Sequence, residues 1–275
     1  MKQLYKYARI NNNTSSALIE RYAWYPKPSS LNDPFDCGLS QSLMGNNDQC
    51  GVLSLSAKNS NILMWSHYAD SHKGVCIEYT DYRDDHLNEV PLKSSINPYH
   101  EGLDELPIIR NATPIEYFST EELNDQLAQL PQTLDDLNRE LMNYNAGPLT
   151  REKYKDSFLI KGMKALFMKH EDWSYEAEYR IVTGEGDRPI AAPGIVTTIF
   201  LGMNASEMQC QHVYRIGSEI GAPVLKMERV ARKYELAPRE LTDTEKKRPH
   251  PSFSRPINNH LRMLEIQERL DGPYD

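Results

Sequence analysis

Three charged residues, Glu176, Glu178 and Arg180, occupy alternate positions in the chain. Alternation at period two is typical of a β-strand, and it predicts that the three side chains share one face. Burying such charges without partners is costly, so they are solvated, joined in a structural salt bridge, or arranged around a ligand. Trp173 and Tyr175 precede them and can stack a flat ring, and a carboxylate here could stabilise a cationic, sugar-like transition state.

Two hydroxyl side chains, Ser54 and Ser56, alternate with leucines in another stretch that has the pattern of a strand. They are expected to point to the same face of that strand. Small residues beneath a helix are the simpler interpretation of this pair, and the lining of a ligand pocket is the functional one.

The densest group of aromatic and imidazole side chains is formed by Trp65, His67, Tyr68 and His72. On a helix, Trp65, Tyr68 and His72 can point together while His67 points elsewhere. A lone histidine is more commonly a hydrogen-bonded structural group than a base. The chain has no His-x-x-x-His pair, no glycine-rich phosphate loop and no Gly-x-Ser-x-Gly elbow. No metal is therefore predicted, and neither P-loop nor serine hydrolysis is expected.

The elements that position these residues are predicted from hydrophobic periodicity and turn signals. Asn59 or Ser60 is expected to cap the helix that carries Tyr68, and Asn32 and Asp33 fall in a polar loop. Strands are expected over 4–8, 51–56, 73–79, 175–182, 194–200 and 223–234, and helices over 16–24, 64–69, 119–143 with a break at Pro131, 150–167 and 205–220.

This order of elements predicts an α+β fold with a mixed, mainly antiparallel central sheet, flanking helices and a helical insertion. A single domain is expected over 1–241, with the insertion at about 115–148. Residues 242–275 are expected to form a linker and a C-terminal amphipathic helix.

Composition narrows the class of protein. The chain has 275 residues, of which 39% are hydrophobic, so it can build one large core. Its four cysteines form no Cys-x-x-Cys pair, and no apolar run is long enough to span a bilayer, so a reducing, cytoplasmic location without membrane contact is predicted. A net charge of −8 argues against broad binding to nucleic-acid phosphates.

A hydroxyl-aliphatic-hydroxyl strand followed later by Glu-x-Glu resembles the arginine-serine-glutamate class of ADP-ribosyltransferases. The resemblance implies a split central sheet, a nicotinamide pocket supported by Ser54 and Ser56, and a catalytic Glu178 that stabilises the oxocarbenium-like ribose as nicotinamide leaves. The first-strand arginine of that class corresponds to Arg9, although Lys6 or Tyr7 could equally take its place.

The motifs Asn-Asp-Pro-Phe, Trp-Ser-His-Tyr-Ala and Tyr-Glu-x-Glu-x-Arg resemble those of a large microbial family, the domain of unknown function numbered twenty-nine seventy-one. The resemblance runs from about Leu4 to Leu241. A purely structural signature would be mostly apolar, so the polar character of these positions indicates a shared site. The matching positions are Lys6, Tyr7, Asn32, Asp33, Phe35, Trp65, His67, Tyr68, Gly74, Glu176, Glu178 and Arg180.

The first functional hypothesis is an ADP-ribosyltransferase-like enzyme that consumes NAD, acting in phage–host conflict or as a toxin. It would pass ADP-ribose to water or to a macromolecular acceptor, protein or nucleic acid. The candidates for catalysis are Glu178, Glu176, Tyr68 and His67. The candidates for binding NAD or a related nucleotide are Lys6, Tyr7, Arg9, Asn32, Asp33, Ser54, Ser56, Trp65 and Arg180.

Two alternatives remain open. Asp33, Asp36, Glu176 and Glu178 could hold a divalent metal in a nuclease. The same polar motifs could instead be the ion-paired scaffold of a non-catalytic binding or regulatory protein, whose C-terminal amphipathic stretch, 257–270, docks a partner. The oligomeric state does not follow from the sequence.

Overall fold

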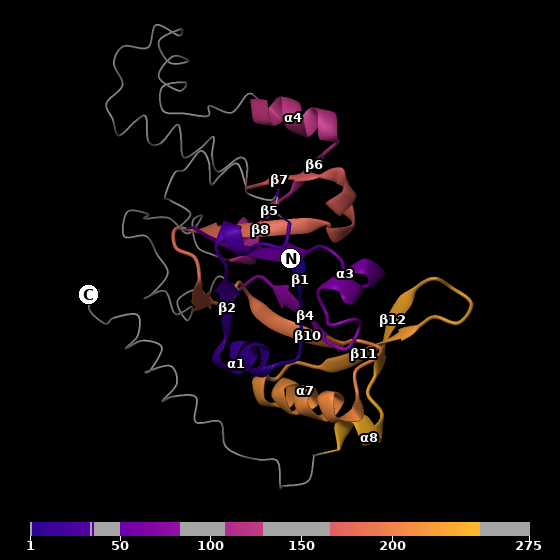
Figure 1. Ribbon diagram of the computed structural model, residues 1–275. Helices are drawn as coiled ribbons and strands as arrows, with labels where there is room; N and C mark the ends of the chain where they lie inside the picture. The colour runs from indigo at the N-terminus through magenta and orange to yellow at the C-terminus, as the bar shows by residue number, and fades with distance from the viewer. Residues whose placement is uncertain (1, 34, 36–49, 83–107, 129–165, 248–275) are drawn as a thin grey trace, which may run out of the picture.

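The fold is built on one eight-stranded sheet (Figure 1). The computed structural model describes residues 2–33, 35, 50–82, 108–128 and 166–247. The strand order is β12-β11-β10-β4-β1-β3-β8-β5, and only the β10–β11 pair is parallel. The expected mixed, mainly antiparallel sheet is therefore confirmed. The strands are β1 (Gln3–Ala8), β3 (Gly51–Ser56), β4 (Val75–Thr80), β5 (Thr113–Pro114), β8 (Glu178–Thr183), β10 (Ile195–Leu201), β11 (Val224–Arg229) and β12 (Leu236–Glu240).

Smaller elements surround this sheet. Two further strand pairs are antiparallel β2 (Tyr22–Tyr25) with β9 (Arg188–Ala191) and parallel β6 (Glu116–Phe118) with β7 (Met168–His170). The α-helices are α1 (Asn12–Glu20), α3 (Ile62–His67), α4 (Thr120–Ala128), α7 (Glu207–Ile220) and α8 (Asp243–Lys246), and the 3-10 helices are η1 (Pro28–Ser30), η5 (Ile109–Asn111) and η6 (Glu171–Glu176). None of the helices in the described ranges is long and apolar enough to cross a bilayer.

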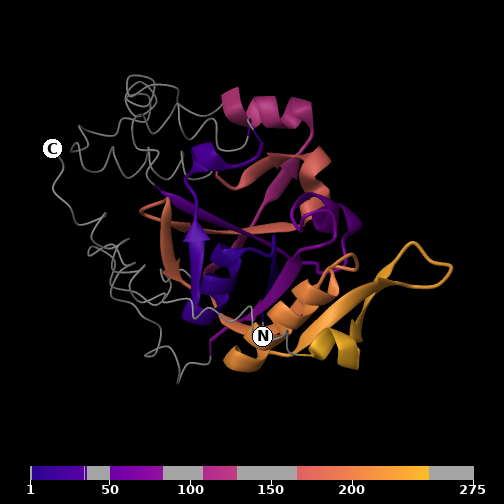
Figure 2. The same cartoon turned by 60° about the horizontal axis from the view of Figure 1, so that its bottom comes forward.

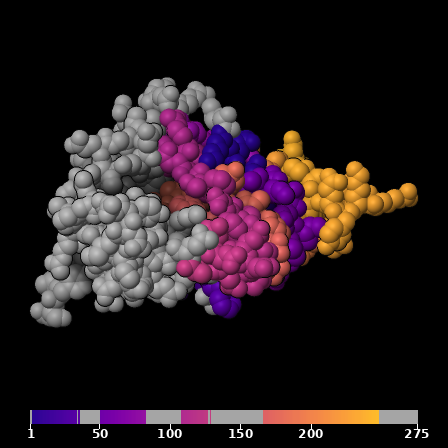
Figure 3. All heavy atoms as spheres, turned by 90° about the horizontal axis from the view of Figure 1, so that it is seen from above, coloured from indigo at the N-terminus to yellow at the C-terminus, as the bar shows by residue number. Residues whose placement is uncertain are grey.

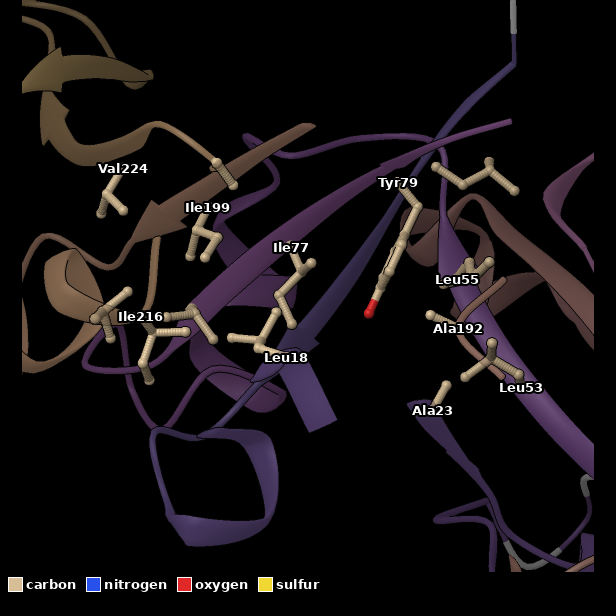
Figure 4. Close-up of a cluster of buried hydrophobic side chains, with 14 of the residues drawn as sticks. Leu18, Ala23, Leu53, Leu55, Ile77, Tyr79, Ala192, Ile199, Ile216 and Val224 are labelled. Carbon is tan, nitrogen blue, oxygen red and sulfur yellow. The ribbon is translucent and has the colours of Figure 1, made fainter. Parts of the chain in front are cut away.

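One face of the sheet is covered by α1 and α7, which lie together in front of the strands in Figure 2. Leu18 of α1 and Ile216 of α7 belong to the same buried cluster as Ile77 and Ile199 of the central strands (Figure 4). Removing these apolar surfaces from water is the main stabilising term of the fold.

The opposite face of the sheet is covered by α3. Trp65 is completely buried there and meets the ring of Tyr7 edge-on, at 5.3 Å between ring centroids. Cys76, Phe200 and Met227 complete this second cluster. Successive side chains of β1 point to opposite faces of the sheet, so Leu4 packs in the first cluster and Tyr7 in the second.

The sheet has the fewest paired residues between β1 and β3. The two strands pair at a single position, Tyr5 opposite Ser56, whereas β1 pairs with β4 along its whole length. On the side that faces β1, the backbone of β3 before Ser56 must therefore find other hydrogen-bond partners. This partial separation of the sheet creates room for side chains between the two strands.

Several predicted elements have different bounds. The helix expected over 16–24 is α1, which begins after Asn11, whose side chain accepts a hydrogen bond from the Thr14 amide. Arg21, in the left-handed conformation, ends it, and β2 follows where helix was expected. The strand expected over 223–234 is a hairpin, β11 and β12, whose tip projects from the rest of the described chain (Figures 1 and 3).

The expected strand over 175–182 begins only at Glu178. The residues before it form η6, and Ala177 ends that turn with a φ of 44°. Strand-like alternation in the sequence is thus interrupted by a left-handed residue. The predicted caps of α3 are also wrong, because Asn61, not Asn59 or Ser60, accepts from the Leu63 and Met64 amides.

The predicted insertion and tail are described only in part. Within 115–148, β6 precedes α4, so this stretch is not wholly helical. At the other end, Thr242 caps the short helix α8, where a linker was expected. The remainder of the helical predictions for 119–143 and 150–165, and the amphipathic stretch 257–270, lie outside the described residues.

Candidate functional site

A pocket of about 210 Å³ lies where β1 and β3 separate. Strands β1 and β3 form one side, α3 and the loop after η1 another, and the glutamates of η6 and β8 the third. Segments distant in sequence thus meet at one cavity. The predicted site residues that line it are Lys6, Tyr7, Asn32, Ser54, Ser56, Tyr68, Glu176 and Glu178.

The two glutamates are bridged by one buried ammonium group. Lys169 Nζ donates to Glu176 Oε2 at 2.7 Å and to Glu178 Oε2 at 3.3 Å. Arg180 donates to both oxygens of Glu178, from Nε at 2.7 Å and from Nη2 at 3.1 Å. All four side chains are buried. Their charges balance, since two cations face two carboxylates.

Glu176 also accepts a short hydrogen bond from the Tyr68 hydroxyl. The Asn32 amide donates to that hydroxyl oxygen at 2.7 Å, so Tyr68 is held from both sides. Burial, together with the contact to Glu176, raises the pKa of Tyr68 well above its usual range. Tyr68 therefore stays a hydrogen-bond donor to the carboxylate at neutral pH.

The two glutamates differ in their tendency to hold a proton. Burial raises the pKa of Glu176, and Lys169 and Tyr68 offset only part of that effect. Burial acts on Glu178 in the same direction, but the charges and hydrogen bonds of Arg180 and Lys169 outweigh it and lower the pKa to about 2. Glu178 is therefore ionised at neutral pH, whereas Glu176 is the carboxylate better able to take up a proton.

The two predicted serines lie on one face of β3, as expected, with different contacts. Ser54 hydrogen-bonds to Glu178 through its side chain and accepts from Lys6 Nζ at its carbonyl, at 2.9 Å. Ser56 donates its hydroxyl to the Glu176 carbonyl at 2.6 Å. Both serines thus position the glutamates. Ser54 contacts the side chain of Glu178, and Ser56 contacts the backbone carbonyl of Glu176.

The turn after α3 fixes the place of Tyr68. Three successive residues, Asp70, Ser71 and His72, have positive φ, a conformation that costs free energy for residues other than glycine. Gly74 follows, and a Cβ there would lie 2.2 Å from the carbonyl oxygen of Ala8 on β1. The turn can therefore approach β1 closely only because residue 74 has no side chain.

The other predicted site residues lie outside the pocket lining. Trp65 is a core residue whose Nε1 donates to the Asn59 carbonyl at 2.7 Å. His67 is exposed, and its ring lies 6.2 Å from that of Tyr175. Asp33 is buried and accepts from the Phe35 amide.

Arg9 and Arg180 also lie outside the lining. Arg9 is exposed beyond the end of β1. Arg180 reaches the pocket only through its contact with Glu178, behind which it is almost completely buried. Asp36, proposed as a metal ligand, falls outside the described residues.

Two residues of the site do not stand out in the sequence: Lys169, which bridges the glutamates, and Tyr117, whose hydroxyl accepts from the Glu178 amide at 2.8 Å. A charge count offered a signal for Lys169. Two buried glutamates and one arginine leave a net negative charge, which predicts at least one further cation beside them. The sequence does not show that this cation comes from β7.

The comparisons place the second half of this site in a known family. The model of a family described as a protein of unknown function, DUF2971, matches residues 64–181. Residues 64–181 are therefore similar to that family. The matched segment contributes Tyr68, Lys169 and both glutamates, whereas β1 and β3 lie outside the match. No curated protein and no solved structure matches the chain.

Proposed function

We propose that the protein cleaves the nicotinamide–ribose bond of NAD and transfers ADP-ribose to water or to a macromolecular acceptor. One observation carries the proposal: the pocket holds two glutamates whose surroundings drive their pKa values apart, downward for Glu178 and upward for Glu176. Paired carboxylates of this kind typically divide the electrostatic and proton-transfer roles of glycosidic bond cleavage.

In the proposed reaction the bond between the ring nitrogen and the ribose breaks, and nicotinamide leaves with the electron pair. The sugar becomes cationic, and the negative charge of Glu178 stabilises it. The acceptor hydroxyl or water then attacks the sugar and passes its proton to Glu176. Tyr68 and Asn32 hold Glu176 in position for that transfer.

The size of the pocket supports binding of one part of the dinucleotide. Its volume of about 210 Å³ is below the range of roughly 300–1,000 Å³ typical of sites that enclose a whole drug-sized ligand. The reacting end of NAD would therefore enter, with the remainder lying along the surface. The exposed ring of His67 lies beside Tyr68, and the half-buried rings of Tyr175 and Trp173 continue the row away from it. These rings offer a stacking surface next to the pocket.

A non-catalytic ligand-binding protein is the second candidate. It is favoured by the pairing of Glu178 with Arg180, because both carboxylate oxygens already accept hydrogen bonds from the arginine. The nuclease alternative has less support. Protein cations already contact the carboxylates that would bind metal, and within the described part of the chain no group of three or more His, Cys, Asp or Glu side chains could hold an ion.

Nicotinamide release from NAD by the purified full chain tests the proposal. We expect turnover by the unmodified protein and a loss of at least about 100-fold in Glu178→Gln and in Glu176→Gln, a typical effect of removing one electrostatic or proton-transfer group. Glu219→Gln, on the exposed surface of α7, is the matched control and should turn over normally.

Absence of turnover with retained NAD binding would favour the binding protein. Absence of both would remove NAD from consideration.

A further inference from the structure

Lys6 occupies the gap between β1 and β3. Its ammonium group donates to the Ser54 carbonyl, which has no strand partner on β1 at that position. The side chain thus replaces a missing backbone hydrogen bond of the split sheet. An ammonium group has three donors, and this contact uses one of them.

The charge of Lys6 has no direct counterpart among the described residues. The nearby carboxylates of Glu176 and Glu178 lie within ion-pair distance of Lys169, and Glu178 also of Arg180, but neither forms an ion pair with Lys6. Three cations, Lys6, Lys169 and Arg180, therefore lie near two carboxylates. A half-buried ammonium group left in this state is unfavourable unless an anion joins it or it loses its proton.

Burial also lowers the pKa of Lys6, against a smaller opposing effect of Glu178 and Glu176. The direction is that expected of a cation whose compensation is incomplete. Because Lys6 lines the pocket, a bound ligand is able to reach it.

We infer that Lys6 is an anion-binding residue, and that the pocket takes a ligand through a carboxylate or phosphate group that accepts from the donors of the Lys6 ammonium group not used by Ser54. The ligand's negative charge would bring the group of three cations and two carboxylates to neutrality. This inference concerns binding alone and holds for either candidate function. If NAD is the substrate, the phosphate next to the nicotinamide ribose is the part of it that has this chemistry, and it would enter the pocket together with the reacting end.

Titration calorimetry with the full chain compares nicotinate with nicotinamide, two rings of equal size of which only the first is an anion. We expect nicotinate to bind about tenfold or more tightly than nicotinamide, the difference of one charge-assisted hydrogen bond. Inorganic phosphate is the third probe, and the tighter of the two anions identifies the preferred group. Equal affinities, a preference for nicotinamide, or no binding of any probe would overturn the inference.

Two variants assign the effect to Lys6. Lys6→Met should remove the preference for the anion, and Lys6→Arg should keep it. Lys73→Met changes an exposed lysine in the turn before β4 and should behave as the unmodified protein does. Because removing an uncompensated charge does not break an ion pair, Lys6→Met should remain folded in a thermal melt. Persistence of the preference in a folded Lys6→Met variant would refute the role of Lys6.

The outcome is separable from the NAD assay. A chain that releases nicotinamide from NAD but does not discriminate nicotinate from nicotinamide overturns only the anion site. A chain that prefers anions through Lys6 but leaves NAD intact overturns only the proposed reaction.

Discussion

A single ammonium group, that of Lys169, connects the two glutamates of the pocket. It contacts Glu176 and Glu178 and lies 4.7 Å from the centroid of the Trp173 ring. In a buried ion network, each charge is tolerated only while its partners remain. The residue-scale predictions therefore concern what happens when one member is changed or protonated.

Replacing Lys169 by methionine should lower the free energy of unfolding by about 3–5 kcal/mol at pH 7, because a buried carboxylate pair is left without its bridging cation. Urea denaturation measures the change. The double variant Lys169→Met/Glu176→Gln should recover part of the loss, since one of the uncompensated charges is removed. If the double variant is as unstable as the sum of the two single variants, the proposed coupling between the residues is absent.

The opposite pKa shifts of the two glutamates predict opposite effects of acid. Glu178 has its pKa lowered to about 2, so its stabilisation is complete above an unfolded value of 4.5 and is lost as the pH falls from 4.5 toward 2. Glu176 has its pKa raised, so it favours the folded state at pH below 4.5 and loses that contribution as the pH rises above it.

A carboxyl-carbon NMR titration should show these shifts directly. The Glu178 signal should titrate near pH 2, and the Glu176 signal above pH 4.5. Each signal is assigned by its absence from the spectrum of the corresponding variant, Glu176→Gln or Glu178→Gln. Midpoints close together and near 4.5 would show that the pocket does not distinguish the two groups.

At the scale of elements, the junction of η6 with β8 places Glu176 and Glu178 on either side of one left-handed residue. Ala177 has a φ of 44°, and its carbonyl accepts from the Ala57 amide, which connects the junction to the end of β3. If β8 began before Ala177, Glu176 would be part of that strand. The left-handed turn instead directs Glu176 toward Tyr68, which follows the last residue of α3.

Ala177→Gly should raise the free energy of unfolding by up to about 1 kcal/mol, because glycine adopts positive φ without a steric penalty. Ala237→Gly is the matched control in β12, where the backbone is regular, and it should lower the free energy by about 0.5–1 kcal/mol. Urea denaturation measures both changes, since a shift of the midpoint reports a change in stability when the dependence of the free energy on urea stays the same. A loss of stability at both positions would show that the left-handed conformation carries no strain.

At the scale of the whole molecule, two completely buried cysteines report on the two faces of the sheet. Cys76 belongs to the buried cluster between the sheet and α3, and Cys210 to the buried cluster between the sheet and helices α1 and α7. Burial also raises the pKa of both thiols, which further slows their reaction.

Alkylation of the native protein should therefore modify the half-buried Cys50 well before Cys76 or Cys210. In increasing urea, Cys76 and Cys210 should become reactive together, as expected if the single sheet unfolds cooperatively. Peptide mass spectrometry follows each site. Reaction of one thiol at clearly lower urea than the other would show that the two faces unfold separately.

Much of the fold was predictable because its strands have strong local patterns. The segments 4–8, 51–56 and 194–200 alternate or are β-branched, and each is a strand in the structure. The capping box of Ser206 and Gln209 likewise fixes the start of α7 close to the expected position. Local sequence sufficed where one residue pattern pointed to one conformation.

The misplaced elements have a common physical cause, which is tertiary contact overriding a local pattern. The segment around Ala177 alternates like a strand, but its first half folds as η6 because Asn61 and Ser56 bind its carbonyls from α3 and β3. The pairing of β2 with β9 joins segments more than 160 residues apart, so no local signal marks it.

The same limit applies to the candidate site. Eight of the side chains selected by residue type and spacing line one pocket. The same criteria also selected Trp65, which is a buried core residue. Aromatic residues serve both purposes, and only the packing shows which. Lys169 was missed because its role depends on glutamates that reach it through the fold.

The three tryptophans sit in three different settings, Trp24 half exposed at 51%, Trp65 fully enclosed, and Trp173 beside the ammonium group that bridges the glutamates. Indole emission depends on neighbouring charge and on contact with water. Because Lys169 lines the cavity and lies over the Trp173 ring, occupancy of the cavity would shift the electric field at Trp173. The fluorescence of that indole would then report on the site without a label, once Trp24 is replaced by phenylalanine.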